Sequence, residues 1–156
     1  MALAPQLAHR FREVILDGTW IANTNFKHQI SELSVVQATT KIGNFNTIAL
    51  LTFHVNYYTS GLVQVFKGGT LDIRDKFSFD APELKSENDW IELKETLFKN
   101  AERFAEFVEQ MTDNELNADF IDPKYGSYYR NIEALIEHAY YHLGQVSLLK
   151  KMIVNS

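Results

Sequence analysis

The pattern of apolar and polar residues predicts helices over most of the chain. Its clearest run follows Ser86, where apolar side chains recur at steps of three or four residues, the spacing that keeps them on one face of a helix. The apolar positions of this run are Trp90, Leu93, Leu97, Ala101, Phe104, Val108 and Met111. Because these steps resemble a bundle seam and the run contains no histidine, we expect a scaffold helix here.

Helical spacing recurs in other parts of the chain. Helical stretches are expected over residues 3–16 and over residues 20–33, either as two helices or as one bent helix. A further helix is expected to end at the glycine pair Gly68-Gly69, and the last helix to begin at residues 127–129. Glycine is a common helix stop, and Asn44 or Asn46 is the expected N-cap of the helix that ends at the glycine pair. The segment between residues 34 and 42 is interpreted as a connection that contains at most a short helical turn.

Two polar motifs mark the starts of further helices. Ser86 with Asp89, and Thr112 with Glu115, have the spacing of a capping box, in which two side chains bond the first free backbone N–H groups of a helix. Together with the near absence of strand patterns, these signals predict an all-α bundle. Short connections would make neighbouring helices antiparallel. A chain of 156 residues can bury a substantial core, so we expect one domain over residues 1–156.

The longest irregular stretch covers residues 70–85 and contains Phe77 and Phe79. A loop of this length inside a compact domain is either disordered or functional. Its aromatic side chains indicate that it packs on something, either on a partner subunit or beside a pocket.

Composition narrows the class of protein. The chain has no cysteine, which excludes disulfides, thiolate ligands and a cysteine nucleophile, and its net charge of −5 comes with no basic stripe that would favour nucleic acid. We expect no membrane span, because no apolar run reaches about 18 residues, and no signal peptide. A cytoplasmic location follows as an expectation.

Histidines provide the candidate chemistry. At about 100° per residue, His138 and His142 fall in the same helical stripe as Leu135, Val146 and Leu149. Two polar rings on an apolar face need hydrogen-bond partners or a metal ion. They can be ordinary core or rim histidines bonded to a tyrosine or a backbone carbonyl, or they can be a pair of metal ligands.

A third histidine favours the metal. His54 lies in a separate predicted helix and shares a face with Leu50, Tyr58 and Val65. Three inward imidazoles from two helices can hold one ion and leave coordination positions open, the arrangement of a catalytic site. The expected cofactor is one divalent transition metal, zinc or nickel first, with iron, copper or manganese as alternatives.

These residues resemble a known family. A histidine in the second long helix, here His54, followed by the His138-x-x-x-His142 pair and the tail Gly144-Gln145, resembles the DinB-like (DinB/YfiT) superfamily of metal-dependent enzymes. The resemblance extends over the chain length and the helix order. It implies an antiparallel four-helix bundle with extra short helices, a homodimer, and His54, His138 and His142 as the metal ligands.

Two more residues are candidates for the cofactor site. Tyr58 lies nearest the ligand face and can donate to a group bound at the metal, although a packing aromatic with its hydroxyl at the rim is the alternative. Gln145 can hold a histidine tautomer or line the pocket. The chain lacks the His-Glu-x-x-His pattern of zinc proteases, because Ala139 follows His138, and it indicates no catalytic acid or base.

Two chemistries fit an open three-histidine centre. One is hydrolysis, in which the ion lowers the pKa of a water. The other is transfer or isomerisation that uses a small thiol from solution, which the resemblance also implies. Both predict a small-molecule substrate. The alternative is a non-catalytic metal-binding bundle whose role is dimerisation or partner binding.

Overall fold

The computed structural model describes residues 2–155, so residues 1 and 156 of the expected domain lie outside the described part. Within it, helices form all regular structure apart from one isolated bridge between Asp119 and Ser127. The prediction of an all-helical fold is therefore confirmed. None of the helices in residues 2–155 combines the length and the hydropathy that a membrane span requires.

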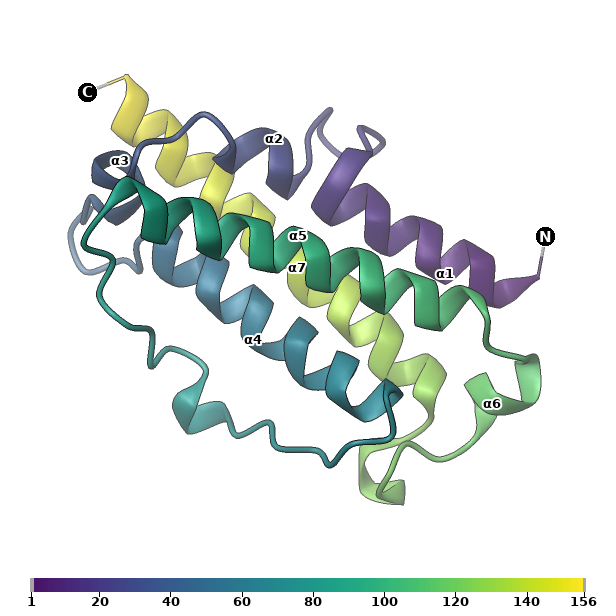
Figure 1. Ribbon diagram of the computed structural model, residues 1–156. Coiled ribbons are helices and arrows are strands. Elements are labelled where there is room, and N and C mark those ends of the chain that lie inside the picture. Colours follow the sequence, from purple (N-terminus) through teal and green to yellow (C-terminus); the bar gives the residue numbers. More distant parts are fainter. Residues whose placement is uncertain (1, 156) are drawn as a thin grey trace.

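Four long helices dominate the structure (Figure 1). They are α1 (Leu3–Arg12, continued by the π-helical turn η1, Glu13–Asp17), α4 (Ile48–Phe66), α5 (Glu87–Glu109) and α7 (Tyr128–Val154). The short elements are α2 (Phe26–Ile30), α3 (Val35–Thr39), η2 (Asp75–Phe77), α6 (Asp113–Asn117) and η3 (Pro123–Tyr125). The predicted stop after α4 is present, and Gly68 there has a positive φ of 85° that glycine adopts without strain.

Both predicted capping boxes are present. The side chains of Ser86 and Asp89 cap α5 reciprocally, and those of Thr112 and Glu115 do the same for α6. The predicted N-cap of α4 is wrong. Thr47 occupies that position, and its hydroxyl accepts the N–H of Leu50, because the helix begins after both asparagines rather than at either of them.

The predicted helix over residues 20–33 is also largely wrong. Residues 20–23 form turns, in which Ala22 and Asn23 both have φ of 55°, a left-handed conformation that interrupts a right-handed helix. Asn25 then caps the short helix α2 by accepting the N–H of His28 and donating to the backbone oxygen of Gly18. Local capping therefore overrides the apolar spacing that runs through this stretch.

The core lies where α5 packs on α1 and α4, and α4 in turn packs on α7. The predicted α5 seam faces this core: Trp90, Leu97, Ala101, Phe104 and Val108 are all buried. The Trp90 indole donates to the backbone oxygen of Leu33 at 2.8 Å, so its polar atom is satisfied inside the core.

Figure 1 shows α4 and α5 running in the same direction, with α1 and α7 running the opposite way. The expectation of antiparallel neighbours therefore holds for α1 with α5 and for α4 with α7, but not for α4 with α5. Two parallel helices need a connection that returns along their length. Residues 67–85, the crossover segment, make this return, which explains why the longest irregular stretch lies between these two helices.

The crossover segment is fastened to α4 as it passes. The Tyr57 hydroxyl accepts the N–H of Arg74 at 2.9 Å and donates to the Arg74 oxygen at 3.1 Å. One turn further along α4, Gly61 leaves the space that the Ile73 side chain fills, because a Cβ at Gly61 would collide with it. These contacts hold the segment against the face of α4 that carries His54.

Candidate metal centre

The structure brings together the three histidines singled out in the sequence. His54 comes from the middle of α4, whereas His138 and His142 lie one turn apart on α7, the helix that packs beside it. One ring nitrogen from each lies within 4.8 Å of the others. The four-residue step of α7 places both of its rings on the side that faces α4. His9 and His28, by contrast, are exposed.

The ring nitrogens converge closely around His138. Its Nε2 lies 3.0 Å from Nε2 of His54 and 3.0 Å from Nε2 of His142. Two imidazoles that share a tetrahedral zinc ion at about 2.0–2.1 Å have their nitrogens roughly 3.3–3.4 Å apart. The observed spacing is therefore close to that of nitrogens that share one ion.

The outer nitrogens of two rings set their tautomers. His54 Nδ1 lies 3.1 Å from the backbone oxygen of Ser78, and His142 Nδ1 lies 2.7 Å from Oε1 of Gln145. An oxygen of either kind accepts, so each Nδ1 carries the proton and each neutral ring presents a bare Nε2 lone pair toward His138. Gln145 thus makes the first of the two contacts considered for it, the one that holds a tautomer.

Neutral His138 carries one ring proton, so it cannot donate a hydrogen bond to both bare Nε2 atoms. If the proton is on Nε2, it bonds one neighbour and leaves a second bare nitrogen 3.0 Å away. If it is on Nδ1, three lone pairs face each other, and Nδ1 is buried without a hydrogen-bond partner, alone in this among the side chains of residues 2–155. With the His138 proton on Nδ1, a shared cation would pair the three facing lone pairs, so the donor set fits a metal ion.

Electrostatics keep the rings neutral. Burial lowers the pKa of His54, His138 and His142, because a charged imidazole loses solvation there. The shift is largest for His138, whose pKa falls to about 4 as the neighbouring His142 and His54 also oppose its protonation. Neutral imidazole is the form that binds metal, so the site is prepared for a ligand role near neutral pH.

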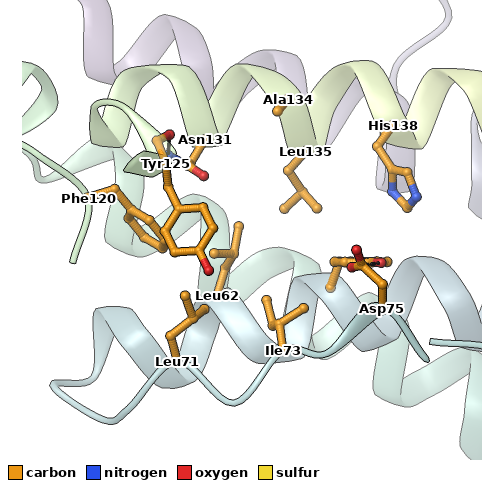
Figure 2. A pocket seen from close by; sticks show the side chains of 11 residues that line it. Leu62, Leu71, Ile73, Asp75, Phe120, Tyr125, Asn131, Ala134, Leu135 and His138 are labelled. Carbon is orange, nitrogen blue, oxygen red and sulfur yellow. Dashed lines mark hydrogen bonds between the residues drawn. The ribbon is translucent and has the colours of Figure 1, made fainter. Parts of the chain in front are cut away.

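A cavity of about 450 Å³ opens beside the cluster and reaches His138 (Figure 2). Tyr58 and Asp75 line it at the same end, and apolar side chains line its middle. This size lies within the range of small-molecule sites, about 300–1,000 Å³. A group bound at the histidines can therefore be reached from this cavity.

Tyr58 lies beside the cluster, but its hydroxyl hydrogen is engaged. Its ring centroid is 5.2 Å from that of His54 and 5.1 Å from that of His138, and its hydroxyl donates to Asp75 Oδ1 at 2.8 Å. Burial, and then this hydrogen bond, raise the pKa of Tyr58. The phenol therefore stays protonated and pairs with Asp75.

The crossover segment contributes three residues to the site, and sequence reasoning assigned none of them to the histidines, although it expected the loop aromatics, Phe79 included, to pack on a partner subunit or beside a pocket. Phe79 stacks on the His54 ring at a centroid distance of 3.9 Å, Ser78 supplies the oxygen for its Nδ1, and Asp75 faces the cavity. The aromatic content of the loop was the available signal, and it did not indicate which side chains the aromatics would contact. A backbone oxygen such as that of Ser78 leaves no signal in residue type.

The carboxylates of α7 are not part of the site. Glu137 is exposed and pairs with Arg130 at 3.3 Å, and Glu133 lies 3.7 Å from Arg10. Neither is among the residues that line the cavity. The charged group nearest the histidines on the cavity side is therefore Asp75, which is distant from them in sequence.

Comparison with known sequences identifies the family. A sequence model of the DinB superfamily matches residues 21–146, which include all three histidines. The chain belongs to the DinB superfamily. Searches of curated proteins and of solved structures found no match. The match covers α4, α5 and most of α7, so both helices that carry the histidines of this DinB superfamily member lie within the family region.

Proposed function

We propose that this DinB superfamily protein is a metal-dependent enzyme that acts on a small molecule bound in the cavity beside the three histidines. The observation that carries the proposal is that the bare Nε2 lone pairs of His54 and His142 both point at Nε2 of His138, which has at most one proton to share between them. A cluster built only for packing would pair its protons internally. In this cluster the unpaired Nε2 lone pairs point at a shared centre next to a cavity.

The residues of the chain have separable tasks in this proposal. His54, His138 and His142 would hold the ion, and the Ser78 oxygen and Gln145 fix the orientation of two of them. Bound there, a divalent ion would supply Lewis-acid chemistry and lower the pKa of a water or a thiol. Tyr58 and Asp75 line the end of the cavity where the reaction would occur, and they would orient the substrate there. A thiol would come from solution, since the chain contains no cysteine.

Zinc or nickel is the proposed ion, because three imidazoles in a compact site suit both. We also propose that the four long helices form the bundle expected from the family resemblance, as one domain, and that the protein is a homodimer. Sedimentation equilibrium measures directly whether the protein is a dimer. A monomer at micromolar concentration would remove the dimer from the proposal.

Elemental analysis of the native protein, purified without chelator, tests the centre, and the expected content is close to one ion per chain. Activity is then screened in two arms: ester hydrolysis without thiol, and conjugation of bromobimane or epoxide electrophiles with added small thiols. The matched control is His28→Ala, which removes an exposed histidine away from the cluster. We expect His54→Ala to lose metal and turnover together, and His28→Ala to keep both.

Each outcome of this experiment has a defined meaning. Turnover in one arm selects hydrolysis or thiol transfer. Metal bound by the wild type but turnover in neither arm favours the non-catalytic metal-binding bundle. Metal content that is unchanged in His54→Ala contradicts the proposed centre altogether.

A further inference from the structure

The cavity has one polar end at the histidines and an apolar body. Figure 2 shows His138 and Asp75 at one end, and Phe120, Tyr125 and Asn131 at the other. Asn131 and His138 are seven residues apart on α7, which corresponds to about 10 Å along the helix. The site is therefore elongated, and it runs parallel to α7 away from the metal centre.

Apolar side chains form the walls between the two ends. They come from α4, the crossover segment, the turn before η3, and α7, and they are Leu62, Leu71, Ile73, Phe120, Ala134 and Leu135. Four separate parts of the chain thus contribute apolar side chains to one cavity wall. Apolar surface of this kind favours an apolar ligand, since polar groups would lose their hydration without gaining partners.

The charges around the cavity are one-sided. Asp75 is an acid, and within residues 2–155 no lysine or arginine is among the side chains that line the cavity. At the far end the polar groups are Asn131, whose amide donates to the backbone oxygens of Tyr125 and Ser127, and Tyr125 itself. Tyr125 is 45% exposed there, and Nζ of Lys124 lies 4.8 Å from its ring centroid. A negative group placed between the two ends, along the apolar walls, would therefore have no cation beside it.

We propose that this cavity selects molecules with a single polar head, which lies at the three-histidine cluster, and an elongated, uncharged apolar body that lies along α7 between the cluster and Asn131. The position of the head rests on the proposed metal function, whereas the apolar body rests on the cavity walls alone. Molecules that carry an anionic group on the body, between the cluster and Asn131, are excluded by the same geometry.

Two ligand series of increasing chain length test the proposal on the native protein by isothermal titration. Straight-chain alcohols probe the apolar body alone, and straight-chain hydroxamic acids add a head that binds metals. We expect affinity in both series to rise about three- to fourfold per methylene until the cavity is filled, and hydroxamic acids to bind more tightly than alcohols of equal length. Placing a carboxylate on the middle of the hydroxamic acid chain should weaken binding by more than about tenfold.

Variants locate the binding site. Ala134→Phe fills the middle of the cavity from α7 and should abolish the dependence on chain length while the metal content stays unchanged. Leu148→Phe enlarges a side chain that is exposed on the same helix, and it should bind like the wild type. Alanine 134 is partly exposed, so the larger ring has room to enter the cavity without displacing the core.

The outcomes separate the two proposals. No dependence on chain length in either series overturns the apolar body, whatever metal is present. Equal binding of the mid-chain carboxylate overturns the exclusion of anions from the body. Chain-length dependence in both series, with hydroxamic acids no tighter than alcohols, supports the apolar body and contradicts the metal function on which the head depends.

Discussion

Gln145 offers the sharpest test of how the proposed metal site is held, because it contacts one of the three proposed metal ligands without being one of them. Its Oε1 lies 2.7 Å from Nδ1 of His142, a ring that is only 6% exposed. Replacement by leucine removes the acceptor and keeps a helix-forming residue of similar size. The free ring can then move its proton to Nε2 and bond His138, which lies 3.0 Å away. A metal ion must displace that proton before it binds.

The expected magnitude follows from this hydrogen bond. A buried N–H that loses its acceptor costs about 1–3 kcal/mol, which corresponds to roughly 5- to 150-fold in affinity. Partners of metal-bound histidines generally contribute about 10- to 100-fold, so we expect Gln145→Leu to weaken zinc binding within that range. Competition against a chromophoric chelator measures the change, and far-UV circular dichroism of the metal-free proteins verifies equal helicity.

Gln145→Glu is the matched control. A carboxylate keeps an acceptor oxygen at the same position and makes the imidazole more basic, so zinc affinity should be unchanged or higher. The reasoning would be refuted by Gln145→Leu binding zinc as tightly as the wild type. It would be equally refuted by glutamate and leucine weakening binding to the same extent, since that would show a packing role instead.

The remaining predictions concern the ligands, the acid response and the crossover segment. His54→Ala should lose most bound metal with helicity near native, as measured by elemental analysis and circular dichroism, and full metal content would contradict its role. In the chelator-treated protein, the unfolded chain takes up a proton on His138 near pH 6.5, whereas the folded protein resists protonation down to about pH 4. The melting temperature should therefore be highest above pH 6.5 and fall between pH 6.5 and 4, and a flat profile over that window would count against the buried neutral ring. Gly61→Ala places a methyl group against Ile73, so limited proteolysis should cut the crossover segment faster than in the wild type, with Gly144→Ala, where a Cβ meets nothing within 4 Å, as the control.

The helices were largely predictable because their signals are local. The α5 seam, the two capping boxes and the glycine stop after α4 depend on residues within a few positions of each other, and each was found where the sequence placed it. The errors came where two local signals competed. Apolar spacing across residues 20–33 indicated one helix, but the left-handed conformation at Ala22 and Asn23 divides the stretch.

The candidate site was predictable in part for the same reason. His138 and His142 share a face because of helix periodicity alone, and His54 was identified by its position in an apolar stripe. The residues that complete the site lie in the irregular crossover segment, where no helical spacing of apolar residues predicts their direction; they are Asp75, Ser78 and Phe79. Their proximity to His54 depends on the path that the crossover segment takes over α4.

By itself, the sequence determined the helical class, most helix boundaries and the choice of three histidines, because these depend on spacing and capping within single helices. Only the tertiary structure decided that α4 and α5 run parallel, that the crossover segment therefore returns over the histidines, and that an apolar cavity opens beside them. The physical reason is distance along the chain. Which surfaces meet depends on how the whole core packs, and no short window of residues contains that information.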